Sequence, residues 1–419
     1  LCSVRAVPMN REDVKTVGGA AHRPMAYFND GHGIFYNADQ PGPHLVKDAL
    51  EPFAHDGWDI CCFGTIGADL VNYPSRVGTV PGVAGWQFIR PGDRNLAMTL
   101  KTMLEAGEDP LKQAVDQAHA QGQEFWFYLR PQGWAMDPGL DHHFRSDFYS
   151  RHPEWRCVES DGTPLSKLSI AFPEVREQLN TIIAEGIERG ADAVCLTFVR
   201  GYPLVRYERP VLERYRSVYG RDARQVPDSD AGLQEIWRET VTGWLKEIRT
   251  LLDRTTPHSV RGRRKLAVMT GGNADWGKRL GIDLKNLAMQ GLLDAVFFSQ
   301  RGILDDVRRV EAIGEDPMDV KSYVAALEGA DTKIYPCLYT AGEQKKLTFA
   351  ELFRRAYEYY RQGATGLACW DTPAWYSRLH LDSPEVMALW IERYLPPKDN
   401  RFTEVAGLTV DRFPPMIFG

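Results

Sequence analysis

The sequence lacks long hydrophobic runs and has little excess of either charge, and each of these absences excludes a class of partner. No stretch approaches the roughly 20 consecutive apolar residues that a membrane-spanning helix needs, so we expect no membrane partner. The net charge of −6, with 25% charged residues, provides no basic surface of the kind that binds nucleic acid or an anionic membrane. We therefore expect neither partner, and the question of a homo-oligomer stays open.

A cysteine framework is also missing. The chain has seven cysteines, and they form neither a CxxC pair nor a zinc-ligand spacing. Cys61, Cys195, Cys337 and Cys369 lie inside apolar runs, as small buried side chains do. No disulfide framework can be inferred, so cysteine usage does not identify the compartment. The opening Leu1-Cys2-Ser3 suits a trimmed or processed exported chain, which slightly favours a soluble protein of the periplasm or the cell exterior.

What the sequence does contain is an alternation of short apolar runs and amphipathic segments from about residue 25 to residue 375. This pattern is typical of a parallel sheet covered by helices. Several helices end at a glycine just before the next run, as in Arg189-Gly190-Ala191, because glycine accepts the left-handed conformation that ends a helix. Helices are expected over Glu174–Arg189, Leu233–Arg254 and Phe349–Gln362. The predicted strands are Met25–Asn29, Trp58–Phe63, Glu124–Leu129, Ala193–Phe198, Lys265–Met269, Ala295–Ser299, Lys333–Leu338 and Gly366–Trp370.

Eight such units, without a GxGxxG after the first strand, favour an α/β fold of the (β/α)8 TIM barrel type. A doubly wound nucleotide-binding sheet is the alternative. We expect an N-terminal extension over residues 1–24 and a catalytic barrel over residues 25–395. Residues 396–419 are expected to form a C-terminal strap or the start of a truncated appendage. Long insertions over Asp69–Asp109 and Pro131–Phe172 follow the second and third strands, where loops build the active sites of barrels.

Three short motifs resemble a known group of barrels. They are His152-Pro153-Glu154-Trp155, then Asp161-Gly162, then Pro173-Glu174-Val175-Arg176 at the start of a helix. This stretch is similar to the segment between the third strand and the helix before the fourth in barrels grouped with family 10 glycosyl hydrolases and in α-galactosidase and amylase barrels. The strand order and Trp370-Asp371 at the last strand also fit, and the resemblance covers most of residues 25–395. It implies a glycosidase of carbohydrate metabolism, with bacterial polysaccharide degradation as the expected setting.

One position departs from the pattern of these barrels. Many relatives carry an Asp near the end of the fourth strand, often as the nucleophile, whereas this strand reads Cys195-Leu196-Thr197-Phe198-Val199-Arg200. Thr197 occupies the acidic position, and threonine cannot replace a carboxylate that attacks or stabilises an oxocarbenium ion. Either other carboxylates carry the chemistry, or hydrolysis is lost and the barrel only binds carbohydrate.

Glycoside cleavage needs two carboxyl groups on either side of one bond, and in a barrel these come from the ends of different strands. We predict Asp371 and Glu208 as the catalytic pair, with Asp275 in reserve. Asp371 directly follows the eighth strand, although an Asp before Pro373 is also typical of a turn or a helix N-cap. Glu208 lies in a loop rich in Tyr, Arg and Pro, where a salt-bridge role is the alternative. The glycines before Asp275 allow close approach of a ligand or simply form a turn.

Further residues at the predicted strand ends are assigned to substrate binding. Asp30 suits a sugar hydroxyl or a helix cap. For Arg130 and Arg200 there are three interpretations: they recognise an anionic sugar, they hold the active-site carboxylates in place, or they form a structural ion pair at the rim of the barrel. Exposed tryptophans would stack on the apolar face of a sugar, although a single tryptophan more often packs in the core. The assigned residues are Asp30, His32, Arg130, Trp134, Arg200, Trp276, Gln300, Tyr339, Trp370 and Trp375.

The sequence signal for a metal site is poor, so we expect no metal and no cofactor. His142 and His143 are adjacent and cannot easily face one ion, and His32 has only Asp30 nearby. A divalent site assembled from several strand ends would instead make the chain a sugar lyase or isomerase. The sequence thus predicts a glycoside hydrolase that acts on an oligosaccharide or a glycoside. The metal-dependent enzyme and the carbohydrate-binding barrel are the two alternatives.

Overall fold

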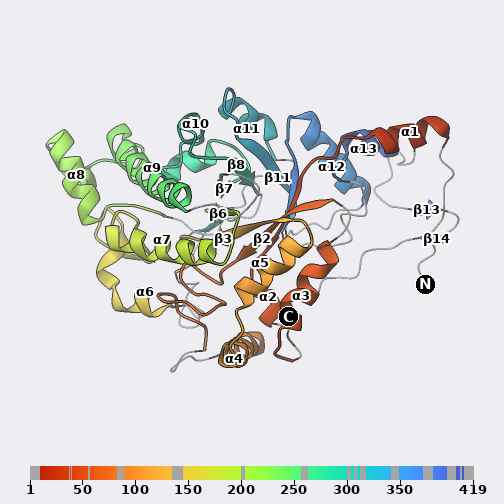
Figure 1. Ribbon diagram of the computed structural model, residues 1–419. Helices are drawn as coiled ribbons and strands as arrows, with labels where there is room; N and C mark the ends of the chain where they lie inside the picture. The colour runs from red at the N-terminus through yellow and green to blue at the C-terminus, as the bar shows by residue number, and fades with distance from the viewer. Residues whose placement is uncertain are drawn as a thin grey trace.

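The computed structural model is a closed barrel of parallel strands surrounded by helices (Figure 1). The structure describes residues 10–36, 38, 40–54, 57–82, 88, 90–134, 145–199, 203–255, 263–299, 303–305, 309–311, 318–340, 349–370, 381–393, 403–405 and 408–409. Within these ranges, none of the helices combines the length and the apolar composition of a membrane-spanning segment.

Eight strands close the barrel in the order β1-β12-β11-β8-β7-β6-β3-β2. They are β1 (Met25–Asn29), β2 (Trp58–Gly64), β3 (Glu124–Leu129), β6 (Ala193–Thr197), β7 (Lys265–Thr270), β8 (Ala295–Phe298), β11 (Lys333–Thr340) and β12 (Leu367–Trp370). All neighbouring pairs run parallel, including the closing pair of β1 and β12. The predicted (β/α)8 barrel is therefore confirmed, and each predicted run forms a strand whose ends lie within two residues of the expected ones.

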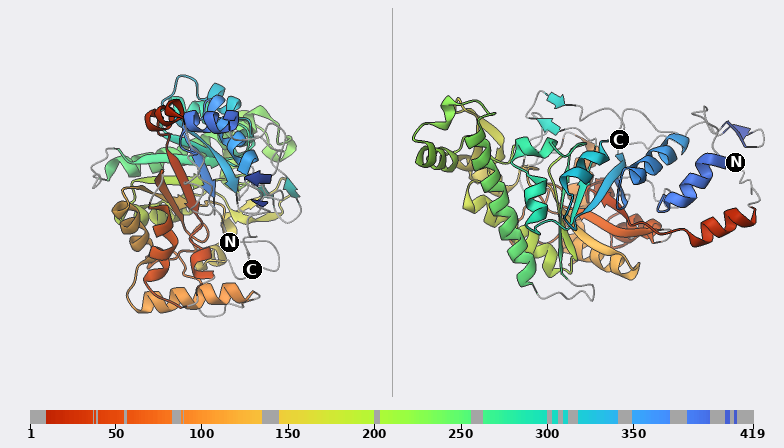
Figure 2. Two further views of the ribbon diagram at one scale, coloured as in Figure 1. Left: turned by 90° about the vertical axis from the view of Figure 1, so that its right-hand side faces the viewer. Right: turned by 90° about the horizontal axis from the view of Figure 1, so that it is seen from above.

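Helices cover the outside of the barrel, and others extend from it. The α-helices are α1 (Arg11–Gly19), α2 (Gly33–Tyr36), α3 (His44–Leu50), α4 (Pro91–Glu105), α5 (Pro110–Ala120), α6 (Asp147–Arg151), α7 (Pro173–Glu188), α8 (Arg209–Tyr219), α9 (Ala231–Arg254), α10 (Leu284–Met289), α11 (Val320–Ala326), α12 (Phe349–Arg361) and α13 (Pro384–Arg393). In the views of Figures 1 and 2, α8 projects at one end of the molecule and α1 lies beside α13 at the other. The smaller strands are β4 (Arg156–Val158), β5 (Pro164–Leu168), β9 (Ile303–Asp305), β10 (Arg309–Glu311), β13 (Thr403–Val405) and β14 (Leu408–Thr409).

Helix α7 shows how the sequence positions a barrel helix. It begins at Pro173, whose fixed φ suits the first turn of a helix. Its apolar face, which includes Leu179 and Ile183, is buried. At Gly186 an added Cβ would lie 2.7 Å from the ring of Phe127, so the helix packs closely on β3 only because this residue has no side chain.

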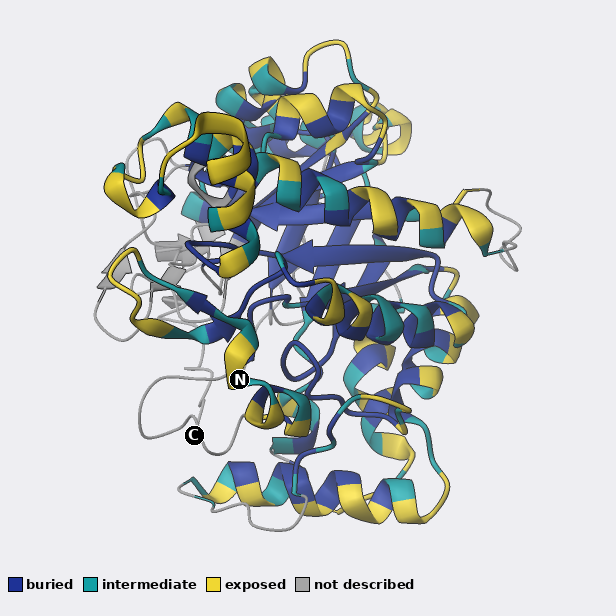
Figure 3. Ribbon diagram, turned by 90° about the vertical axis from the view of Figure 1, so that its left-hand side faces the viewer, coloured by how far each residue is buried: buried dark blue, intermediate teal, exposed yellow. Residues whose placement is uncertain are grey.

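The barrel interior is filled by aromatic and small side chains, and the strands form the most buried layer of the molecule (Figure 3). Phe28, Trp126, Tyr128 and Phe297 are each at most 1% exposed. Phe28 meets the rings of Tyr128 and Phe297 edge to face, at 5.5 and 5.0 Å between ring centroids. Edge-to-face contacts are favourable beyond the area they bury. The four cysteines expected inside apolar runs are likewise buried, with free thiols: Cys61, Cys195, Cys337 and Cys369.

A recurring contact fastens the strands in pairs at the N-terminal end of the barrel. A side chain at the start of the second strand of each pair accepts a hydrogen bond from a backbone N–H at the start of the first strand. The donors and acceptors are Met25 with Asp59, Phe125 with Asp192, Leu266 with Asp294 and Ile334 with Thr365, at 2.9, 2.9, 2.8 and 3.0 Å. A glycine with positive φ shortly precedes each acceptor: Gly57, Gly190, Gly291 and Gly363. We call these contacts the strand-start clasps.

Each aspartate of a strand-start clasp also contacts a basic side chain from the segment before the first strand of its pair. His119 Nε2 lies 2.8 Å from Asp192, and Arg249 donates to Asp294 at 3.1 Å. His22 lies between two carboxylates, 2.9 Å from Asp59 and 2.9 Å from Asp382. Burial lowers the pKa of His22, but the hydrogen bonds and charges of Asp382 and Asp59 outweigh it and raise the pKa above its ordinary value.

The raised pKa of His22 predicts a pH-dependent contribution to stability. The contribution is fully present below the unfolded pKa of about 6.5, where imidazolium pairs with both carboxylates, and is lost as pH rises through the raised folded pKa. We expect His22→Gln to lower the melting temperature more at pH 5.5 than at pH 9. Differential scanning calorimetry of both proteins measures this, with exposed His44→Gln as the control. An equal loss at both pH values would contradict the prediction.

Candidate functional site

A cluster of polar and aromatic side chains lies at the C-terminal ends of β1, β3 and β12. Asp30 directly follows β1, and Arg130 directly follows β3. Trp370 is the last residue of β12, and its indole N–H donates to Asp30 Oδ1 at 2.7 Å. Tyr128, on β3, donates its hydroxyl to the same oxygen at 3.2 Å. Because the carboxyl ends of parallel strands meet at one face of a barrel, these four residues from three strands form one group, which we call the Asp30 cluster.

The charge of Asp30 is balanced inside the cluster. Its carboxylate forms an ion pair with the guanidinium of Arg130, and each side chain is 14% exposed. The guanidinium also lies over the rings of Tyr128 and Trp370, 5.5 and 5.9 Å from their centroids. Burial lowers the pKa of Arg130, but Asp30 and Tyr128 outweigh it and raise the pKa above its ordinary value. The guanidinium is therefore charged, and the carboxylate of Asp30 balances its charge within the cluster.

His32, on the turn after β1, lies beside the Asp30 cluster and toward helix α4. Burial lowers its pKa to about 4, so the imidazole is neutral at physiological pH. Its ring centroid lies 5.0 Å from that of Tyr36. The positive charge of Arg90 also lowers the pKa of His32. Arg90 itself donates two hydrogen bonds of 2.8 Å to Asp93.

The loop after β7 carries Asp275 and is held rigidly. The backbone N–H of Ala274 donates to Ser322 Oγ at 3.0 Å, and Tyr323 Oη donates to the carbonyl of Asn273 at 3.1 Å. Asp275 itself is solvent-accessible: its side chain is 79% exposed, and its carboxylate lies 2.7 Å from Lys278 Nζ. The loop thus presents an accessible carboxylate at the C-terminal end of the barrel.

Glu208 is in a different environment, because it is buried at 1% exposure. Its carboxylate accepts hydrogen bonds from the backbone N–H groups of Arg206, at 2.9 Å, and Val158, at 3.2 Å. Burial raises the pKa of Glu208 to about 7, although these hydrogen bonds act in the opposite direction. Val158 belongs to β4, so Glu208 joins the β4–β5 hairpin to the loop after β6.

The described tryptophans of the predicted site are buried, contrary to the expectation of exposed stacking surfaces. Trp134 and Trp370 are 0% exposed and Trp276 is 5% exposed. Trp134 stacks on Phe148, with centroids 6.0 Å apart, and Trp276 packs over Gly271, where an added Cβ would lie 2.5 Å from the indole. Packing against neighbours in the chain accounts for the burial of these rings, as it does for Trp370 in the Asp30 cluster.

Several predicted site residues lie outside the described part of the chain. They are Asp371, Arg200, Gln300 and Trp375. Tyr339 lies in β11, and its side chain is outside the description as well.

Two residues of this region were missed by the sequence reasoning. Tyr128 precedes Arg130 by two positions on β3, and the alternation of side chains along a strand was the available signal that both face the same side. Gln132 gave no signal in the sequence.

Thr197, the departure from the acidic pattern, is buried at the end of β6. Its neighbour Leu196 pairs with Leu129, so Thr197 is level with Arg130.

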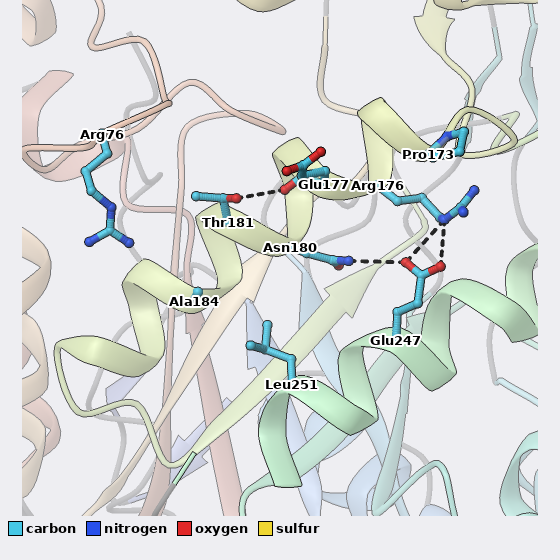
Figure 4. A pocket seen from close by; sticks show the side chains of 9 residues that line it. All are labelled: Arg76, Pro173, Arg176, Glu177, Asn180, Thr181, Ala184, Glu247 and Leu251. Atoms are coloured by element: carbon cyan, nitrogen blue, oxygen red, sulfur yellow. Dashed lines mark hydrogen bonds and ion pairs between the residues drawn. The ribbon is translucent and has the colours of Figure 1, made fainter. Parts of the chain in front are cut away.

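A hollow of about 510 Å³ lies on the outer surface between α7 and α9 (Figure 4). Glu247 points between Arg176, at 3.0 Å, and Asn180, at 3.2 Å. Because these three polar side chains satisfy one another, we assign no ligand to the hollow. In the ranges that the structure describes, no group of three or more His, Cys, Asp or Glu side chains is placed to hold a metal ion.

Comparison with solved structures finds this barrel in glycoside hydrolases. One match is the glycoside hydrolase domain of PgaB (BpsB) from Bordetella bronchiseptica, which is 14% identical in sequence with a TM-score of 0.52. The match covers 88% of the present chain and 97% of the PgaB domain. Another match is the catalytic domain of β-amylase from Paenibacillus polymyxa, which is 11% identical in sequence with a TM-score of 0.54. The match covers 90% of the present chain and 100% of the β-amylase domain. No protein-family model and no curated protein sequence matches the chain. At these identities the likeness concerns the fold, and the chain has the (β/α)8 barrel of these glycoside hydrolase structures, as its sequence motifs imply.

Proposed function

We propose that the chain is a glycoside hydrolase whose active site lies at the C-terminal face of the barrel, around the Asp30 cluster. The observation that carries the proposal is the Asp30 cluster itself, which brings a carboxylate, a guanidinium and an indole from three strands to the face where barrel enzymes bind substrates. The fold shared with glycoside hydrolase structures supports it.

We further propose that Asp371 and Asp275 are the two carboxyl groups of the reaction. Asp371 directly follows Trp370 in the chain, and the hydrogen bond from Trp370 to Asp30 holds the end of β12 in place. Asp275 follows β7, and its carboxylate is accessible to a substrate. In such a pair, one carboxylic acid protonates the leaving oxygen while the other carboxylate attacks the sugar or activates water.

Glu208 is better suited to anchoring the β4–β5 hairpin than to proton transfer, because its carboxylate is closed off by backbone N–H groups. We expect Glu208→Gln to keep turnover close to the wild-type value. Glu208→Ala removes the acceptor from buried N–H groups and is expected to lower the free energy of unfolding by about 1–3 kcal/mol. Steady-state kinetics and urea unfolding measure the two effects. A roughly 10²-fold loss of turnover in the Gln variant, with its melting temperature kept, would restore Glu208 as the acid.

The test of the proposed function is a turnover screen. The protein is incubated with neutral, anionic and cationic oligosaccharides, and products are detected by chromatography with mass spectrometry. Release of shorter sugars by the wild type, and their absence with Asp371→Asn, would support hydrolysis. Tight binding of a sugar without any cleavage would instead select the carbohydrate-binding barrel that Thr197 favours. Activity abolished by a chelator would select the metal-assisted lyase or isomerase.

A further inference from the structure

The two ends of strand β3 carry glutamines with opposite bonding. Gln123, just before the strand, is 2% exposed and fully engaged: its Nε2 donates to Phe53 at 2.7 Å and to Trp58 at 3.1 Å, and its Oε1 accepts from Tyr27 at 3.2 Å. Gln132, just after the strand, is 1% exposed, and neither Nε2 nor Oε1 has a hydrogen-bond partner. Among the described residues, Gln132 is the one whose two polar side-chain atoms are both buried and unpaired.

A buried amide without partners is costly, and protein interiors nearly always avoid it. Gln132 lies on the tight turn after Arg130, which the hydrogen bond from Gly133 N to the Arg130 carbonyl closes at 3.0 Å. The carbonyl of Gly133 in turn accepts from Ala68 N at 3.0 Å, which fixes this turn against the loop after β2. The position of Gln132 is therefore rigid and lies at the substrate face of the barrel. Its amide therefore takes its partners from water or from a ligand that binds at this face.

The described charges of the neighbouring Asp30 cluster and of the Arg90–Asp93 pair cancel, which bears on the class of ligand. Asp30 is paired with Arg130, and Arg90 is paired with Asp93. His32, which lies between these two pairs, is neutral at physiological pH. An anionic or cationic substrate group would have to displace one of these partners. A primary amide, in contrast, offers one acceptor and two donors, which match the hydroxyl groups of an uncharged sugar.

We propose that Gln132 is a substrate-binding residue that recognises hydroxyl groups of a neutral sugar, with one hydroxyl donating to Oε1 and a neighbouring one accepting from Nε2. The inference rests on the proposed function, because it assigns a substrate class to the same site. It differs from the anionic sugar that the two arginines suggested in the sequence, because Arg130 is paired with Asp30; Arg200 lies outside the described residues.

The test replaces each glutamine by methionine, which has a similar length and no amide. Binding of three probes is measured by calorimetry at pH 7: cellopentaose and maltopentaose as neutral sugars, and a galacturonate pentamer as the anionic one. We expect a neutral pentamer to bind the wild type in preference to the anionic one. Gln132→Met should weaken that binding by roughly tenfold or more, because two hydrogen bonds to the sugar are lost. Its melting temperature should be unchanged or higher, because no protein hydrogen bond is lost.

Gln123→Met is the matched control, since it removes a buried glutamine from the opposite end of the same strand. It should lower the melting temperature and leave sugar binding unchanged. Three binding results would overturn the inference. They are a preference of the wild type for the galacturonate pentamer, unchanged sugar binding by Gln132→Met, and no binding of any probe. A fall in melting temperature as large as that of Gln123→Met would overturn it too, because Gln132 would then have a structural partner. Binding of a neutral pentamer without turnover of any sugar would contradict the hydrolase proposal alone.

Discussion

Asp371→Asn is expected to lower turnover by roughly 10²- to 10⁴-fold, in line with the loss of one positioned acid, base or nucleophile. Asparagine keeps the shape of the side chain but has neither the charge nor a proton to exchange. The melting temperature should change little, because the substitution is isosteric and asparagine caps a turn nearly as well as aspartate. Turnover and melting temperature are measured together on the substrate that the screen identifies.

The control for Asp371→Asn is Asp331→Asn, an exposed aspartate paired with Lys333 at the N-terminal end of β11. It should leave turnover unchanged. A fully active and slightly destabilised Asp371→Asn protein would show that Asp371 only terminates the strand, and the reacting carboxyl groups would then have to be sought elsewhere on the same face.

Asp30→Ala is expected to reduce the free energy of unfolding by about 3–5 kcal/mol, because it leaves the buried guanidinium of Arg130 without its counterion. The Tyr128 hydroxyl and the Trp370 indole N–H lose their acceptor at the same time. Chemical unfolding with urea measures the loss. The large effect is expected because both members of the ion pair are mostly buried.

A double-mutant cycle with Arg130→Met distinguishes this structural role from a role limited to the sugar. Removing both charges leaves no unpaired ion, so the double variant should lose clearly less stability than the sum of the single variants. Additive losses would show that the ion pair does not couple the two strands. If Asp30 only bound a sugar hydroxyl, Asp30→Ala would weaken substrate binding and leave the free energy of unfolding unchanged.

The barrel could be predicted from the sequence because its determinants are local. Each apolar run and each glycine at a helix end lies within a few residues of the element it defines, as at Gly190 before β6. A long and regular alternation of such units then leaves few topologies. The resemblance of the His152–Trp155 motif to barrel hydrolases pointed to the same fold.

The site was less predictable, because the role of a polar side chain depends on partners that are distant in the chain. Asp30 and Trp370 are 340 positions apart, yet they share a hydrogen bond. Glu208 was assigned to chemistry from its neighbours in the loop, whereas its hydrogen bond with Val158, 50 positions away, could not be inferred from them. The burial of Trp134 depends on Phe148. No local pattern reveals such contacts, so candidate positions could be predicted from the sequence and their roles could not.

The strand-start clasps have a consequence for how this barrel can change. They fasten successive strands in pairs at the end of the barrel opposite the Asp30 cluster. Strand register is thereby secured without help from the loops that would contact a substrate. Those loops are free to accept insertions and substitutions without unsettling the barrel, since conserving the base preserves the fold while the opposite face diversifies. A scaffold divided in this way tolerates the exchange of one substrate specificity for another, and it is a suitable starting point for directed evolution of the loops.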